Sequence, residues 1–123
     1  MRIDQVQQVL DRLKSASGDI KASALMSADG LMIASSLPPE TDEDQVGAMS
    51  AALLSMGERA TRELALGALE RVLLQGQNGY VMMSAAGSEA VLTVLARQYA
   101  KLGLLFIDVS RAAEELADLL KES

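Results

Sequence analysis

The chain has 123 residues, half of them hydrophobic, with a formal net charge of -6 and neither cysteine nor histidine. This length predicts a single domain over residues 1–123, whose core requires no disulfide or metal. The missing imidazole excludes histidine bases, Ser-His and Cys-His nucleophile pairs, and ordinary zinc sites. The acidic balance disfavours a nucleic-acid partner, because phosphate binding requires basic surface.

The same features predict a soluble, cytoplasmic protein. No apolar run approaches the ~20 residues that span a bilayer, so membrane insertion is not expected. The first residues, from Met1 to Val6, contain no apolar signal region. The absence of cysteine fits a reducing compartment.

The first part of the chain predicts a helix followed by a β-hairpin. The apolar face of this short helix consists of Ile3, Val6, Val9, Leu10 and Leu13. Gly18 follows as a stop, and β-like runs occupy residues 21–27 and 31–35. Asp29-Gly30 between them is a strong hairpin signal, because both residues tolerate positive φ. Asp29 is therefore interpreted as a turn residue, with a catalytic carboxylate as the alternative.

A proline pair at Leu37–Glu40 breaks the sheet, since proline has no N–H to donate to a strand ladder. Thr41 then reads as the N-cap of a helix, with three acids in its first turn, where carboxylates favour the positive end of the helix dipole. A cation site is the alternative for these acids and Glu40, but they lack the spacing and the glycine of a calcium loop.

The helix predicted from Val46 to Leu64 has too little polar surface for a helix that only covers its own sheet. Its apolar stripe recurs at spacings of three and four residues and comprises Val46, Met49, Leu53, Met56, Ala60 and Leu64. Small and apolar neighbours widen this stripe, namely Ala48, Ala51, Ala52, Leu54 and Ser55. We therefore expect the helix to contact a partner as well. Met49 and Met56 belong either to that contact or to the core.

Beyond Gly67 the pattern changes to three strands, predicted at residues 68–75, 80–85 and 89–96. They are joined by an Asn-Gly turn at Gly76–Gly79 and a tight turn at 86–88, which makes an antiparallel meander. The last two strands are apolar on both alternating faces, a pattern typical of strands that are covered on both sides. Helices are therefore expected on both faces of the sheet.

The C-terminal stretch predicts a last helix. Its apolar stripe consists of Leu102, Leu105, Val109, Ala112, Leu116 and Leu119. Its start is ambiguous, because Leu104–Ile107 also reads as strand. The predicted fold class is thus α+β, in the order α-β-β-α-β-β-β-α, with a five-stranded antiparallel sheet between helices.

Little in the sequence supports catalysis. There is no Gly-x-x-x-x-Gly-Lys phosphate loop and no Gly-x-Gly-x-x-Gly motif, and the carboxylates, serines and lysines show no informative spacing. An enzyme is not predicted, and neither a cofactor nor a metal is expected. Arg97 and Lys101 flank Tyr99. This segment is either a small basic surface or a solvent-exposed connection.

The strand at 68–75 predicts a dimer if it forms a sheet edge. An apolar edge is avoided by natural proteins or used for pairing. Glu70 and Arg71 would face each other across a two-fold axis, a favourable cross-strand pair, and the same symmetry brings two long helices together. We predict a homodimer whose interface comprises Met49, Leu53, Met56, Glu70, Arg71, Val72 and Leu74.

Three patches in this order resemble the roadblock family of dynein-light-chain-type domains, which includes bacterial regulators of small Ras-like GTPases. They are the hairpin at 24–35, the small-residue helix at 47–57 and the segment 100–105 before the last helix. The resemblance covers nearly the whole chain. It implies the sheet order 2-1-5-4-3, with the long helix on one face and the terminal helices on the other. It also implies dimers joined through the third strand and the long helix.

The resemblance further implies a non-catalytic platform that binds a small Ras-like GTPase or assembles larger complexes. The candidate partner surface comprises Ala48, Ala52, Ser55 and Arg59. Arg59 and Arg62 either approach a nucleotide or serve solubility, and no catalytic residue is carried over from the family. The alternative functions are a small-molecule sensor, which requires an apolar cavity with converging polar groups, and a structural scaffold without GTPase selectivity.

Overall fold

The structure, a computed structural model, describes residues 2–121. Its helices and strands are α1 (Ile3–Ala16), β1 (Ile20–Ser27), β2 (Met32–Ser36), α2 (Glu43–Glu63), β3 (Arg71–Gly76), β4 (Gly79–Ala85), β5 (Ala90–Arg97) and α3 (Leu102–Lys121). The predicted α+β class and the predicted order of elements are confirmed. No helix within residues 2–121 is long and apolar enough to cross a membrane.

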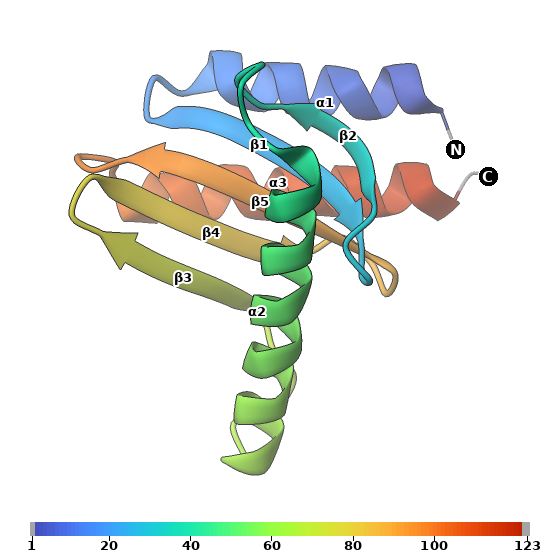
Figure 1. The fold of residues 1–123 in the computed structure, drawn as a ribbon, viewed down its shortest axis with the longest axis vertical. Coiled ribbons are helices and arrows are strands. Elements are labelled where there is room, and N and C mark those ends of the chain that lie inside the picture. The colour runs from blue at the N-terminus through green and yellow to red at the C-terminus, as the bar shows by residue number, and fades with distance from the viewer. Residues whose placement is uncertain (1, 122–123) are drawn as a thin grey trace.

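The five strands form one antiparallel sheet in the order β2-β1-β5-β4-β3. Helices α1 and α3 lie side by side against one face, and α2 crosses the strands on the other (Figure 1). The order and the layering that the family resemblance implied are therefore confirmed. Central strand β5 is covered on both faces, which explains why its residues are almost all buried.

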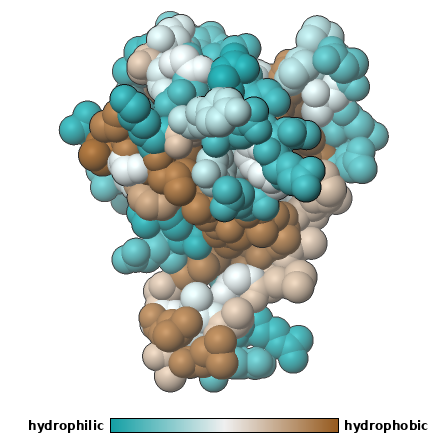
Figure 2. Space-filling model, turned by 90° about the vertical axis from the view of Figure 1, so that its left-hand side faces the viewer, coloured by the Kyte–Doolittle hydropathy of each residue, from teal (hydrophilic) through white to brown (hydrophobic). Residues whose placement is uncertain are grey.

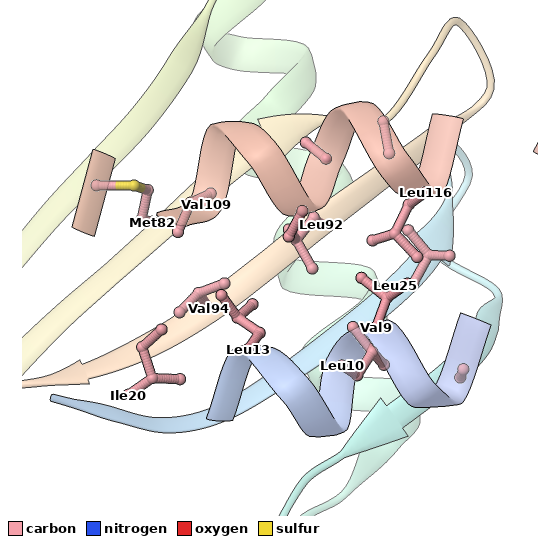
Figure 3. Close-up of a cluster of buried hydrophobic side chains, with 14 of the residues drawn as sticks. Val9, Leu10, Leu13, Ile20, Leu25, Met82, Leu92, Val94, Val109 and Leu116 are labelled. Atoms are coloured by element: carbon pink, nitrogen blue, oxygen red, sulfur yellow. The ribbon is translucent and has the colours of Figure 1, made fainter. Parts of the chain in front are cut away.

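The two faces of the sheet bury cores of different size. The larger core fills the space between the sheet and the α1–α3 layer (Figure 3), and its labelled residues are Val9, Leu10, Leu13, Ile20, Leu25, Met82, Leu92, Val94, Val109 and Leu116. The smaller core lies under α2 and its buried members are Ala24, Met26, Leu54, Met83 and Val91. One helix covers less of a sheet than two, so the α2 face is only partly closed.

Some predicted boundaries are wrong. The N-cap of α2 is Asp42 rather than Thr41, because the Asp42 carboxylate accepts a hydrogen bond from the N–H of Gln45 at 3.2 Å. The residues at 68–70 form a connection, and β3 begins only at Arg71. The ambiguous segment Leu104–Ile107 is helical. Apolar periodicity marks the buried part of an element and says little about its polar first turn.

The predicted Asp-Gly and Asn-Gly turns are both in place, although the Asn-Gly turn forms for another reason. Gly30 has φ +92° in the β1–β2 turn, as the Asp-Gly signal predicts. Between β3 and β4 the turn residues are Gln77 and Asn78, and neither takes a positive φ. Gly79 is instead the first residue of β4, where an added Cβ would lie 2.5 Å from the carbonyl oxygen of Ala96. Close approach of two strands, rather than turn conformation, requires this glycine.

Helix α2 is held against the β1–β2 turn by a backbone contact between two glycines. A Cβ added at Gly30 would lie 2.9 Å from the carbonyl oxygen of Gly47, and a Cβ added at Gly47 would overlap the carbonyl of Gly30. Both atoms in each contact belong to the backbone, so no side chain can rotate away. This contact sets how closely the first half of α2 approaches the sheet.

We predict that Gly47→Ala destabilises the protein by about 1–3 kcal/mol, because the new methyl group forces α2 away from the turn. The matched control is Gly103→Ala in α3, where an added Cβ meets nothing within 4 Å. This control should raise stability by up to about 1 kcal/mol through helix propensity. Urea unfolding followed by circular dichroism measures both, and equal effects of the two substitutions would contradict the proposed contact.

Candidate protein-interaction surface

The side of α2 that faces the sheet is narrow and, apart from Leu54, its buried residues are small. Gly47, Ser50 and Leu54 are its buried members. The hydroxyl of Thr93 on β5 donates a hydrogen bond of 3.0 Å to the hydroxyl of Ser50, and this pair is buried. Because an unpaired buried hydroxyl costs free energy, the pair favours one position of α2 along β5.

The apolar stripe found in the sequence lies on one flank of α2 rather than under it. Leu53 is half-buried against the smaller core, whereas Met49 is 52% and Met56 68% exposed. The two methionines, whose assignment to core or partner was open, are therefore not core residues of a single chain. Their thioether side chains offer an adaptable surface for a protein contact.

Strand β3 is an edge of the sheet, as the dimer prediction requires. Val72 is half-buried beneath α2, and Leu73 and Leu74 are exposed on opposite faces of the strand. Glu70 is exposed and precedes the strand. The Arg71 guanidinium lies 5.0 Å from the ring centroid of Phe106 and donates to the hydroxyl of Ser110 at 3.4 Å.

Part of the sheet beside α2 is uncovered. It forms a shallow depression whose apolar lining includes Leu74, Val81 and Leu95, one from each of β3, β4 and β5. Figure 2 shows hydrophobic surface that runs from this end of the sheet toward the far end of α2. Leu95 is flanked in its strand by the buried residues Val94 and Ala96, so the pattern of β5 alone did not reveal the gap above it.

The last turns of α2 project beyond β3 (Figure 1). Hydrogen bonds from the N–H of Leu66 to the carbonyl of Thr61 and from Ala65 to Arg62 close the helix, with Ala65 in the left-handed region at φ 57°. This is a Schellman motif in which alanine occupies the position that glycine favours. The turn leaves Leu64 and Leu66 about 70% exposed. Leu66 belongs to no periodic stripe, and sequence reasoning missed it.

The side of α2 that points away from the sheet carries the candidate partner surface. Ala48, Ala52 and Ser55 are exposed small residues, which let another backbone approach closely. Arg59 shares this side and forms an exposed ion pair with Glu63, with an N–O distance of 3.0 Å. Such a pair is worth less than about 1 kcal/mol, so Arg59 can exchange it for another anionic group.

The opposite edge of the sheet, β2, is obstructed. The Gln7 amide of α1 donates a hydrogen bond of 2.9 Å to the carbonyl of Ser35, and the hydroxyl of Ser35 donates to the Glu43 carboxylate at 2.5 Å. Side chains from two helices thus bond to Ser35 near the end of β2, one at its carbonyl and one at its hydroxyl. Natural proteins use such cover to prevent strand addition.

Three of the acidic residues that were candidates for a catalytic or cation-binding role, Asp29, Asp42 and Glu43, have structural roles. The Ser27 hydroxyl donates to the Asp29 carboxylate at 2.6 Å, which with a backbone hydrogen bond lowers the pKa of that carboxyl below its ordinary value. Asp29 thereby stabilises the turn, and Asp42 and Glu43 serve the start of α2. Within residues 2–121 no three acidic side chains gather closely enough to hold a metal ion.

Residues 5–96 match the family model of the Roadblock/LC7 domain. The chain belongs to the Roadblock/LC7 family. Two uncharacterized proteins of Methanocaldococcus jannaschii, MJ1340 and MJ0310, are 40% and 39% identical to it over 111 residues. Each alignment covers 90% of this chain and 96% of the relative.

Solved structures share this fold over nearly the whole length of the chain. MglB from Myxococcus xanthus superimposes with a TM-score of 0.89 at 20% identity, covering 98% of this chain and 91% of that protein. The gliding protein MglB from Thermus thermophilus gives 0.88 at 20% identity, with 98% and 92% covered. A Roadblock/LC7 domain from Streptomyces avermitilis gives 0.87 at 23% identity, with 94% and 97% covered.

Ala65→Gly should raise the free energy of unfolding by about 0.5–1 kcal/mol. Alanine in the left-handed region costs roughly 1–2 kcal/mol, a cost that glycine does not have. Part of this gain is lost, because glycine has more conformational entropy to lose on folding. The reciprocal control is Gly67→Ala, at φ +89° with open space around it, which should lower stability by about 1 kcal/mol through conformation alone. Thermal unfolding measures both, and a loss of stability in Ala65→Gly would contradict the assigned helix end.

Proposed function

We propose that this Roadblock/LC7 protein is a non-catalytic homodimer that binds and regulates, or scaffolds, a small Ras-like GTPase. The observation that carries the proposal is the continuous hydrophobic surface from the flank of α2, across the uncovered sheet, to the open edge of β3. A single chain leaves that surface in water, although monomeric proteins rarely expose large apolar patches. Membership of the family supports the GTPase as the partner.

The dimer forms through β3, whose edge is free while that of β2 is obstructed. Antiparallel pairing of two β3 strands gives a continuous sheet with both α2 helices on the same face. Two of the predicted interface residues, Val72 and Leu74, lie in this strand. Arg71 is its first residue, and Glu70 immediately precedes it. Arg71 keeps its contact with Phe106 on the α3 side of the sheet.

The projecting end of α2 matches the uncovered part of the sheet. Gly57 lies over Val72 in the edge strand, so the residues from Glu58 to Glu63 extend past the edge. At 1.5 Å per residue this is about 9 Å, or roughly two strand spacings. In the dimer this end therefore covers β3 and β4 of the second copy, where Leu74 and Val81 are uncovered. Met49, Leu53 and Met56 line the contact between the helices.

The paired helices form the platform for the GTPase. Their outward sides present Ala48, Ala52 and Ser55, which are too small to block a second protein, and Arg59, which supplies a charge. The dimer uses the flank of each helix and leaves this side free. Binding energy in such a surface comes from a few residues, with arginine among the most effective.

The two alternative functions have less support. A sensor needs polar groups that converge on a cavity, yet Ser50 and Thr93 bond to each other and Ser23 alternates onto the opposite face of the sheet. A structural scaffold differs from the leading proposal only in lacking selectivity for a GTPase. Dependence of binding on the nucleotide state of the GTPase separates the two.

For the dimer, the variants Met56→Glu and Leu74→Glu should each give monomers in size-exclusion chromatography with light scattering. Met56 and Leu74 are exposed in a single chain, so the circular dichroism spectrum of each variant should match that of the parent chain. In the dimer the new carboxylate would be buried without a partner, and dimerisation should therefore fail. Leu31→Glu is the matched control, since Leu31 is 69% exposed beside the obstructed edge strand. A monomeric parent chain, or dimers of both variants, would refute the interface.

For the GTPase, the full chain should co-elute with a Ras-like GTPase of its own organism in one nucleotide state and not in the other. Ala52→Arg should weaken this binding at least about tenfold by placing bulk on the platform while the dimer persists. Glu114→Arg, exposed on α3, controls for the added charge. Equal binding in both nucleotide states would favour the unselective scaffold, and no binding in either state would refute the proposal.

A further inference from the structure

The charges of this acidic protein are unevenly distributed in space. Lys14, Lys21, Arg97 and Lys101 lie in or beside two connections, the one between α1 and β1 and the one between β5 and α3. The chain has 11 basic and 17 acidic side chains. The two segments 14–21 and 97–107 contain these four basic residues and one acidic residue, Asp19. Both connections lie at the end of the molecule opposite the two chain termini (Figure 1).

Hydrogen bonds join the two connections into one surface. The Arg97 guanidinium donates to the carbonyl of Gly18 at 2.8 Å, and the N–H of Arg97 donates to the carbonyl of Asp19 at 2.8 Å. The Asp19 carboxylate accepts from the N–H of Lys101 at 3.2 Å. The single acid of these two segments is thus bonded to the backbone, and four basic side chains stand against it.

Three exposed apolar or aromatic residues accompany this charge. Tyr99 is 84% exposed between Arg97 and Lys101, and Leu104 is 57% and Ile107 48% exposed on the first turns of α3. The core of α3 does not use these two side chains, since its buried residues lie on the other side of the helix. A basic surface with a projecting tyrosine and aliphatic residues combines the features of an interfacial membrane contact.

We propose that the basic end of the molecule docks on the headgroups of an anionic lipid bilayer. Lys14, Lys21, Arg97 and Lys101 supply the attraction to the negative surface, and Tyr99, Leu104 and Ile107 enter the interface between headgroups and acyl chains. No part of the chain crosses the bilayer in this arrangement. A bound GTPase would thereby be held at the membrane.

A bilayer fits this end better than an acidic protein segment does. Peptides bind in grooves or along strand edges, which bury the anchoring side chains of the complex. Tyr99 instead projects from the surface, and a projecting anchor suits a planar partner. The opposite end bears acids such as Asp29 and Glu89 in its turns, so the field orients the molecule with its basic end toward a negative surface.

The test is sedimentation of the full chain with phosphatidylcholine vesicles, with and without phosphatidylglycerol. Binding is expected only with the anionic lipid and should weaken as salt is added. Lys14→Gln with Lys101→Gln should reduce the binding about thirtyfold, at roughly fivefold for each charge removed near the surface. Arg2→Gln with Lys121→Gln removes the same charge at the opposite end and should bind like the parent chain.

A second measurement separates lipid from other anionic partners. The chain contains no tryptophan, so Tyr99→Trp gives a single reporter whose emission should shift to shorter wavelength with anionic vesicles. Tyr99→Ser with Leu104→Gln should weaken vesicle binding at unchanged net charge. Equal loss in both charge variants, binding to neutral vesicles, an unshifted emission of the Tyr99→Trp variant, or binding to soluble polyglutamate without binding to vesicles would each overturn the proposal.

Discussion

The position of α2 over the sheet depends on a backbone contact between Gly30 and Gly47. The buried hydroxyl pair of Ser50 and Thr93 fixes the next part of the helix along β5. Because α2 is held at one end of the strands and crosses them, it cannot cover the whole face. The uncovered residues of the sheet and the projecting end of the helix are both consequences of this one constraint.

The two edges of the sheet differ in whether another strand can pair with them. Hydrogen bonds from Gln7 and to Glu43 occupy Ser35 in β2, whereas β3 has no comparable cover among the described residues. Strand addition at a single edge closes on itself after two copies, and it does not continue into a fibre. In the proposed dimer, the second copy covers the hydrophobic residues beside β3.

Net charge describes this molecule poorly. The chain carries -6 overall, yet one end is basic because the segments 14–21 and 97–107 meet there. The basic end and the α2–β3 surface share Lys21, which borders the uncovered sheet, and otherwise use different residues. The proposed second copy, GTPase and anionic bilayer would therefore contact largely different parts of one small domain.

The sequence by itself determined the element order, the hairpins and most of the core, because apolar periods and glycine signals depend on neighbouring residues. It also indicated that α2 carries more apolar surface than is needed to cover its own sheet. Only the tertiary structure decided which flank of α2 the stripe occupies, since Gly47 and Ser50 face the sheet and Met56 does not. It likewise decided that Leu74, Val81 and Leu95 are uncovered and that distant basic residues meet. These properties depend on how elements far apart in the chain pack against one another. Local sequence patterns do not predict this packing.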